Sequence, residues 1–277
     1  MGLRIATNVA SQAVQANLKE VSNAGAAELE KLSSGKRITK AADDAAGLAI
    51  ATNLEAQTKG LRQATRNAND GISLVQTAEG GLAETANILV RLRELTIQAS
   101  SDTVGEVERG FLDKEYQQLT KEIDRIAEST SFNGAYLLNG KGNGTMDFQV
   151  GAFAGEQNLI KFESENADAT ANSIGVSGTG IADKDDALSA IEDIDSAIEK
   201  VSGQRADLGS LQSRLQSTVK NLETQTINQD SARSVIQDVD VAEASASLAS
   251  NNVVKNAAVS TLAQSNQIPL SALRLIG

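Results

Sequence analysis

The stretch that decides the fold is residues 54–92, LEAQTKGLRQATRNANDGISLVQTAEGGLAETANILVRL. Apolar residues recur there every seven positions, at Leu54, Leu61, Ala68, Val75, Leu82 and Leu89. Others fill the intervening positions of the same seam, at Ile72, Ala78, Ala86 and Leu92. A heptad repeat sustained over several turns is typical of a coiled-coil-like helix. We therefore predict a long helix from about residue 57 to residue 99, which ends at Ser100-Ser101-Asp102.

A second heptad seam lies in the C-terminal half, at Ile194, Val201, Leu208, Leu215 and Leu222. The positions between them are again apolar, at Ile191, Ile198, Leu211 and Val219. Two long seams separated by a non-helical middle can pair as an antiparallel bundle. The polar stretch from Asp230 to Asp240 is predicted to break the second helix before a final helix over residues 241–276.

Between the two seams the sequence pattern changes twice. A shorter helix is predicted from about 105 to 129, and the turn signal Ser131-Phe132-Asn133-Gly134 follows it. The segment 136–162 holds most of the aromatic residues and partly alternates in polarity, which predicts one or two β-hairpins. Residues 163–184 are rich in Ser, Ala, Gly, Asn and Asp and are predicted to form a short exposed loop or a weakly ordered cap.

The two ends of the chain, residues 1–33 and 241–276, are helical in pattern but have small apolar faces. Gly35 is the predicted cap of the first helix. Because short helices with so little to bury are marginal in water, these ends need neighbouring copies to complete a core. A dimeric coiled coil is also compatible with this composition. The positions predicted to form the polymerisation core are Ile5, Val9, Val14, Val21, Leu29, Val254, Ala258, Leu262 and Leu273.

Composition lowers the prior for an enzyme. The chain of 277 residues has no Cys, no His and no Trp, which removes ordinary zinc sites, Ser-His-Asp triads and thiol nucleophiles. A site made only of carboxylates remains formally open. A net charge of −11 argues against nucleic acid and anionic membranes as partners. No apolar run approaches membrane-spanning length, and no cleavable secretory signal is expected at the N-terminus.

Specific motifs then point to a family. Several runs resemble the N-terminal signature of bacterial flagellins: residues 32–38 (LSSGKRI), 42–50 (ADDAAGLAI), 67–73 (NANDGIS) and 76–80 (QTAEG). Others resemble the C-terminal signature: residues 206–209 (ADLG), 221–222 (NL), 231–234 (SARS) and 262–267 (LAQSNQ). The resemblance covers about residues 1–140 and 187–277, in the order and spacing of the family.

The resemblance implies a structural protein, not an enzyme, that polymerises into the flagellar filament used for swimming. The expected fold is mainly α: an elongated antiparallel coiled-coil-like bundle with a small β-hairpin region and paired terminal helices. Residues 1–45 and 238–277 would form the inner core, and 46–237 the outer bundle. The large outer variable domains of many flagellins would be absent. A hook–filament junction protein is the alternative.

The resemblance also implies partners and a location. Besides further copies of itself, the chain would meet an export chaperone, the cap and the hook-junction proteins. It would be exported through the flagellar type III apparatus and become part of the extracellular filament. No cofactor, metal, nucleic acid or membrane insertion is expected. Arg91, Leu95 and Glu115 align with residues through which some flagellins are bound by a toll-like receptor, although packing against the next subunit is the favoured reason for their presence.

Other polar residues have a functional and a structural interpretation. Asp43 and Asp44 could serve acid–base chemistry or a cation, but capping of the following helix is favoured. The pair Asp185-Asp186 has the same explanation. Lys36 and Arg37 could bind an anionic partner, whereas an ion pair between subunits is favoured. Ser and Thr residues between 164 and 179 could carry O-linked sugars.

Overall fold

The computed structural model describes residues 7–141 and 144–276, with side chains described as far as Gln267. The long helices are α1 (Val9–Ser34), α2 (Ala45–Ala99), α3 (Glu106–Ser129), α5 (Lys184–Gln237) and α6 (Val241–Ile276). The shorter elements are β1 (Ser131–Phe132), β2 (Ala135–Tyr136), β3 (Thr145–Gln149), η1 (Glu156–Asn158), β4 (Leu159–Glu163), η2 (Ser164–Ala167) and α4 (Ala171–Ile174).

The chain divides into two compact units. Unit 1 comprises Met1–Ala56 and Asn228–Gly277, and unit 2 comprises Gln57–Ile227. The predicted inner core of residues 1–45 and 238–277 is smaller than unit 1, because unit 1 also includes the start of α2 and the end of α5. No helix within the described ranges combines the length and hydropathy of a membrane-spanning segment.

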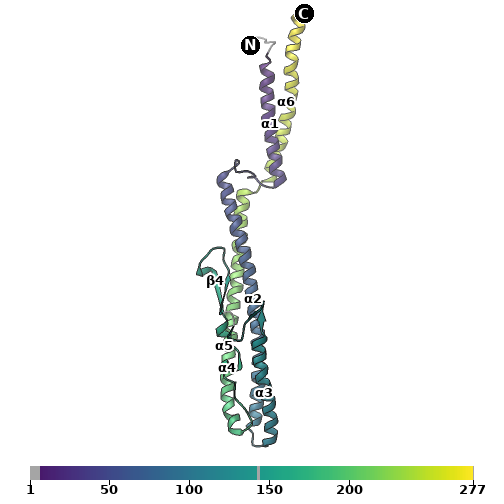
Figure 1. Cartoon of the computed structure of the whole chain (residues 1–277). Helices are drawn as coiled ribbons and strands as arrows, with labels where there is room; N and C mark the ends of the chain where they lie inside the picture. Colours follow the sequence, from purple (N-terminus) through teal and green to yellow (C-terminus); the bar gives the residue numbers. More distant parts are fainter. Residues whose placement is uncertain (1–6, 142–143, 277) are drawn as a thin grey trace. The chain divides into compact units, whose positions relative to one another are not determined.

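Unit 2 is built on the two heptad seams, which lie on α2 and α5 (Figure 1). Within this unit the predicted heptad positions are buried, at Leu61, Ala68, Val75, Leu82, Leu89, Ile194, Val201, Leu208, Leu215 and Leu222. The predicted pairing of the two long seams in one helical bundle is therefore confirmed. Ion pairs tie the helices together outside the core: Arg93 Nε donates to Asp195 Oδ1 across 2.6 Å, and Arg205 Nη2 to Glu79 Oε1 across 2.9 Å.

The third helix of this bundle, α3, begins after a turn that Arg109 organises. Helix α2 ends at Ala99, as predicted from the Ser-Ser-Asp run. Arg109 is only 8% exposed, and its guanidinium donates to the carbonyls of Ala99 at 2.8 Å and Val104 at 3.1 Å. The last carbonyls of a helix have no partner within it, so this buried arginine supplies one. It thereby fixes the path from α2 into α3.

Two antiparallel hairpins follow α3. The first joins β1 to β2 through Asn133 and Gly134, both with positive φ (49° and 81°), as a two-residue hairpin turn of this kind requires. It lies at the predicted turn signal. The second pairs β3 with β4, with Met146 opposite Phe162, inside the segment predicted to contain hairpins. Phe148 of β3 lies close to Gly71 of α2, where a Cβ atom would approach its ring to 3.3 Å.

The prediction of a short exposed loop over residues 163–184 is wrong. Its apolar side chains are buried in the core of unit 2, at Ala167, Ala169, Ala171, Ile174, Val176 and Ile181. Hydrogen bonds donated by its backbone hold the segment in place: Ala169 N donates to Leu138 O at 2.9 Å, and Ile181 N donates to the Asp113 side chain, at Oδ1, across 3.0 Å. The segment packs because most of its apolar residues face inward, with Ala182 exposed, although polar residues dominate its composition.

Unit 1 contains the helix pair α1 and α6, which lie side by side in Figure 1. The cap predicted at Gly35 is confirmed, with φ of 69° in the left-handed region. The predicted break from Asp230 to Asp240 is too long, since α5 continues to Gln237 and only three residues separate it from α6. Asp240 then caps α6 by accepting a hydrogen bond from Ala242 N at 2.8 Å.

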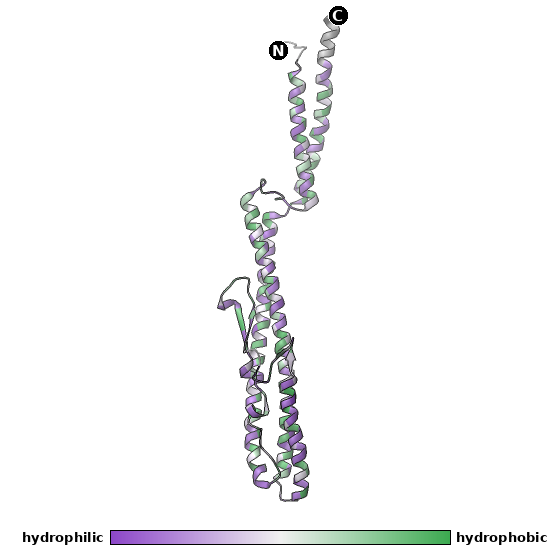
Figure 2. Ribbon diagram, viewed as in Figure 1, coloured by the Kyte–Doolittle hydropathy of each residue, from purple (hydrophilic) through white to green (hydrophobic). Residues whose placement is uncertain are grey.

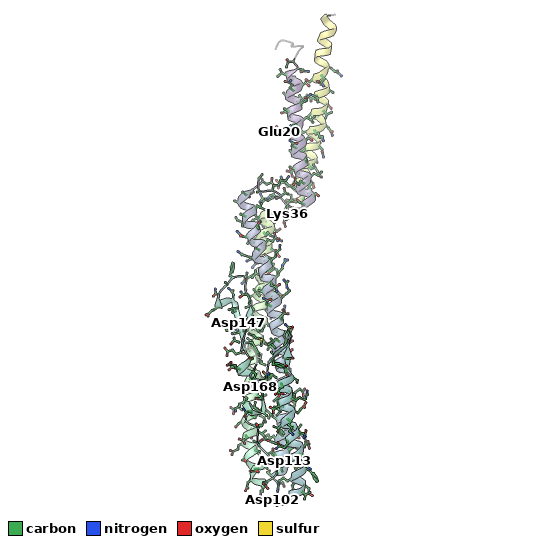
Figure 3. The ribbon with its side chains drawn as sticks, in the orientation of Figure 1. Glu20, Lys36, Asp102, Asp113, Asp147 and Asp168 are labelled. Carbon is green, nitrogen blue, oxygen red and sulfur yellow. The ribbon has the colours of Figure 1, made fainter. Side chains whose placement is uncertain are left out.

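The two connectors of unit 1 pair with each other. Lys36, labelled in Figure 3, forms an isolated antiparallel bridge with Asp238. Arg37 N donates to Gln237 O at 2.6 Å, and Val239 N donates to Gly35 O at 3.1 Å. These bonds pair residues 35–37, before α2, with residues 237–239, where α5 ends. We call these paired residues the joint of unit 1.

Candidate functional site

The helices α1 and α6 bury few of their described side chains within the chain itself. Among the 26 residues of α1 only Ser11 is fully buried, whereas the 24 residues of α3 include five. Polar contacts join the ends of the pair: Asn8 Nδ2 donates to Ser265 O at 3.0 Å, and Ser11 Oγ donates to Asn266 Oδ1 at 2.9 Å. Apolar and polar residues alternate along both helices, as Figure 2 shows by colour.

The predicted polymerisation positions fall into two groups. Four are half-buried between the helices, at Val14, Val21, Ala258 and Leu262. Three are exposed, with Val9 at 61%, Leu29 at 59% and Val254 at 45%. Ile5 lies outside the described residues, as does the side chain of Leu273.

Sequence reasoning missed further exposed apolar residues on α6: Val241 at 62%, Val253 at 69% and Val259 at 50%. Val253 and Val254 are adjacent, so a single helical stripe could not include both equally. Two adjacent valines on a predicted helix were therefore the sequence feature that could have indicated an exposed apolar residue. Beside them, a groove of about 330 Å³ lies between α1 and α6, lined by residues that include Val21, Leu29 and Leu248. This surface can bury apolar side chains of another chain.

The predicted receptor residues lie in unit 2. The guanidinium of Arg91 bridges two carboxylates, with Nη2 at 2.9 Å from Glu115 Oε1 and Nη1 at 2.9 Å from Glu94 Oε2. The hydrogen bond to Glu115 is the main cause of a raised pKa at Arg91. Leu95, by contrast, is 1% exposed and belongs to the core. Of the three predicted residues, Arg91 and Glu115 offer exposed side chains to a partner, and Leu95 does not.

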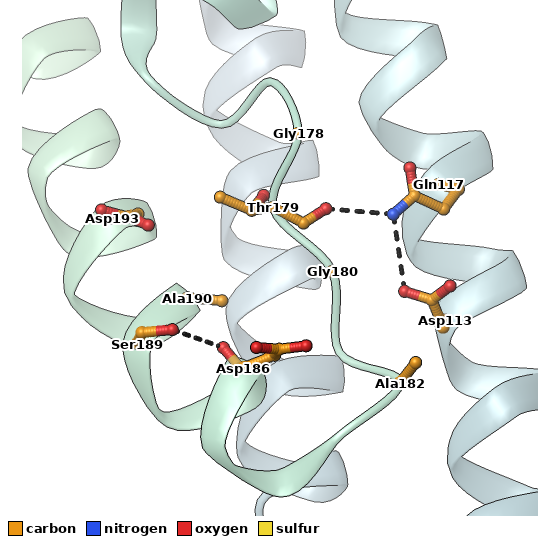
Figure 4. A pocket seen from close by; sticks show the side chains of 10 residues that line it. All are labelled: Asp113, Gln117, Gly178, Thr179, Gly180, Ala182, Asp186, Ser189, Ala190 and Asp193. Atoms are coloured by element: carbon orange, nitrogen blue, oxygen red, sulfur yellow. Dashed lines mark hydrogen bonds between the residues drawn. The ribbon is translucent and has the colours of Figure 1, made fainter.

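An acidic cleft of about 500 Å³ lies between α3, the 178–182 segment and α5 (Figure 4). Asp113, Asp186 and Asp193 line it. Asp113 already accepts hydrogen bonds from Ile181 N at 3.0 Å and from Gln117 Nε2 at 3.4 Å. Within the described residues no group of His, Cys, Asp or Glu is arranged to hold a metal ion. The carboxylate of Asp113 thus anchors the segment to the bundle.

The paired carboxylates at the start of α2 have separate roles. Asp44 Oδ1 accepts from Gly47 N at 2.8 Å, which is a helix cap as predicted. Asp43 Oδ2 instead accepts from the backbone N–H of Lys40 and of Thr39, at 2.9 and 3.0 Å, and these bonds lower its pKa. Asp43 therefore closes the connector loop.

The other polar candidates also have local partners or positions. Asp185 and Asp186 lie in the first turn of α5, where negative charge is favourable. The side chain of Arg37 donates to Ile236 O at 2.6 Å within the joint of unit 1. Among candidate sugar acceptors, Ser164 is 1% exposed, whereas Ser173 and Ser177 are exposed.

Comparison with known proteins agrees with this arrangement. The family model for the bacterial flagellin N-terminal helical region matches residues 5–143, and that for the C-terminal helical region matches residues 191–276. A flagellin of Halalkalibacterium halodurans is 44% identical over 254 residues, which covers 92% of each chain. The crystal structure of Bacillus cereus flagellin matches with 32% identity and a TM-score of 0.51, over 61% of this chain and 94% of that chain.

A protein from Vibrio parahaemolyticus described as flagellar hook-associated matches with a TM-score of 0.59, over 70% of this chain and 99% of that chain. Its sequence identity is 14%, so this likeness shows the fold alone.

Proposed function

The chain belongs to the bacterial flagellin family and is a structural subunit of the flagellar filament, and from this premise we propose that copies polymerise by burying the exposed faces of α1 and α6. Flagellins are structural proteins, not enzymes, and they self-assemble into a filament outside the cell. The hook–filament junction alternative is not favoured, because the family matches and the 44% identical relative are flagellins.

One observation carries the proposal: α1 buries a single residue, Ser11, within its own chain. Its exposed apolar side chains, with those of α6, are the surface that neighbouring copies would cover. Full burial of a Val or Leu side chain contributes about 1.5–3 kcal/mol. Burial of several such side chains per subunit adds to the helical hydrogen bonds in opposing the entropy lost when the ends become ordered. The ends of a free subunit would accordingly be ordered mainly on assembly.

The test uses Val253, which is 69% exposed and makes little contact within its own chain. Val253→Asp should leave the circular dichroism of the soluble subunit unchanged and abolish filaments in electron microscopy, because a carboxylate cannot be buried unpaired. Val253→Thr, of the same shape and without charge, should still polymerise. Removal of residues 241–277 or 1–33 should leave a soluble helical subunit without filaments. Normal filaments from Val253→Asp would contradict the proposal.

The division into an inner core of residues 1–45 and 238–277 and an outer bundle of 46–237 is part of the same proposal. So are export through the type III apparatus and contacts with an export chaperone, the cap and the hook-junction proteins. The exposed apolar stripe of α6 supports the chaperone, since such a surface needs cover before assembly. Co-purification of a chaperone with the full chain, and its loss on removal of residues 241–277, would test this.

A second candidate function is binding by a toll-like receptor through Arg91 and Glu115. It is favoured by the position of both side chains, 50% and 46% exposed, at one surface of α2 and α3. Packing against the next subunit could use the same surface. Arg91→Ala should reduce receptor activation by soluble subunits, whereas Arg125→Ala, an exposed arginine of α3 paired with Glu122, should not. Equal effects of both would place the contact elsewhere.

A further inference from the structure

A small polar cluster lies at one end of the seam between α1 and α6. It consists of Asn8, Ser11, Ser265 and Asn266, and both serines are 6% exposed. The amide of Asn8 is used at both of its atoms: Oδ1 accepts from Ser11 N at 3.1 Å, and Nδ2 donates to Ser265 O at 3.0 Å. The same side chain therefore caps α1 and contacts the backbone of α6.

The acceptor on α6 is a particular carbonyl. In an α-helix the carbonyl of residue 265 would accept from the N–H of residue 269, four positions later. Residue 269 is proline, which has no N–H, and it lies inside the continuous helix Val241–Ile276. The carbonyl of Ser265 thus lacks its helical donor, and buried backbone carbonyls are rarely left without a partner. The side-chain amide of Asn8 supplies the missing hydrogen bond.

We propose that Asn8 and Pro269 together set the register of α1 against α6. A seam of small residues specifies its register weakly, whereas one polar position in a helical seam can fix it. If α1 slips by one turn, the amide of Asn8 leaves the one carbonyl that needs it. In other registers Pro269 leaves the carbonyl of Ser265 without a donor, which costs free energy. In the native register the amide of Asn8 donates to that carbonyl. Asn8 is a positioning residue for assembly, because copies must present matching faces to pack.

The first test measures the critical concentration for polymerisation by sedimentation, and it rests on the proposed function. Asn8→Asp keeps the cap on α1 but has no donor for Ser265 O, so the critical concentration should rise about fivefold to tenfold. In chains that also carry Pro269→Ala, the helix supplies its own N–H, and Asn8→Asp should change the critical concentration by less than about twofold. Ser265→Ala, which keeps the carbonyl, is the control and should have little effect. An equal effect of Asn8→Asp in both backgrounds would overturn the proposal.

The second test reads the register in the soluble full-length chain, where oxidation traps the pairings that α1 and α6 sample before assembly, and it does not depend on filaments. The chain has no cysteine, so introduced pairs report alone. A Cβ atom at Gly25 would lie 3.9 Å from Asn251 Cβ, close to disulfide geometry. The Gly25→Cys, Asn251→Cys pair therefore reports the native register. The Gly25→Cys, Lys255→Cys pair reports a slip of one turn.

The native-register disulfide should form in excess over the slipped one in the unaltered background. That excess should fall about fivefold in Asn8→Asp, which removes the donor for the carbonyl of Ser265. It should fall equally in Pro269→Ala, where the helix itself supplies a donor in every register. An excess that neither substitution changes would show that the cluster does not set register. If the unaltered chain forms no filaments, the proposed function fails, while the disulfide ratio still decides this inference.

Discussion

The adjacent glycines of α2, Gly80 and Gly81, provide a matched pair for testing how closely the 130–138 segment packs on this helix. Both residues are helical, so each loses the same backbone freedom on folding. A Cβ atom added at Gly80 meets nothing within 4 Å. One added at Gly81 would lie 2.6 Å from Leu138 Cδ1 and 2.8 Å from Thr130 Oγ1.

The expected magnitudes differ in sign. Gly80→Ala should stabilise the bundle by about 0.5–1 kcal/mol, because alanine is the better helix former. Gly81→Ala has the same gain but must displace Leu138, which is 0% exposed, and Thr130, whose hydroxyl donates to Ile126 O at 2.7 Å. Overpacking of this kind costs about 1–3 kcal/mol. The two variants should therefore differ by about 1–3 kcal/mol, with Gly81→Ala the less stable.

The assay is thermal unfolding of the soluble full-length chain, followed by far-UV circular dichroism, which reports α-helix content. For a unit of this size, 1 kcal/mol corresponds to a shift in Tm of about 2–4 °C. Gly80→Ala should raise Tm, and Gly81→Ala should leave it below that of Gly80→Ala by about 2–12 °C. Equal melting temperatures for the two variants would refute the close approach of Leu138 and Thr130 to α2.

Three further predictions concern unit 2. Arg109→Met should lower its stability by about 1–3 kcal/mol in chemical denaturation, because the carbonyls at the end of α2 lose their donor. Leu92→Ala at a fully buried position should cost about 2–5 kcal/mol, whereas Val90→Ala, at 51% exposed, should change stability by less than about 0.5 kcal/mol. The hydrogen bond from Arg93 lowers the pKa of Asp195 from its ordinary value of 3.8. The ionised carboxylate therefore contributes its full share to stability above pH 3.8, and this share is lost as the pH falls through the lowered pKa. Asp195→Asn should make stability less dependent on pH in that range.

The helical plan of unit 2 could be predicted because its signal is both local and repeated. Leu82 and Leu89 occupy the same seam position on successive heptads, and both are 0% exposed. Such a repeat restricts the buried face without any knowledge of the partner helix. The end of α2 at Ala99 and the cap at Gly35 were also readable, since Ser-rich runs and glycine act on the chain next to them.

The 163–184 segment could not be predicted from its composition, because its order depends on partners distant in sequence. Ile181 N donates to the side chain of Asp113, which lies on α3. Ala169 N donates to the carbonyl of Leu138, which follows the first hairpin. Small apolar residues spaced irregularly carry no periodic signal. Only the helices that they contact show which of them are buried.

The same reasoning explains why the candidate assembly surface was only half predicted. A heptad count finds side chains that face a helix of the same chain, such as Val21, but it gives no reason for Val253 to be apolar as well. In the proposed assembly, the exposed pair Val253 and Val254 is buried by another subunit, so no partner within the chain marks these positions. The polar contact of Asn8 with Ser265 is invisible for a different reason. It requires a proline 261 positions away, and only the antiparallel pairing of α1 with α6 makes that proline and that asparagine parts of one hydrogen bond.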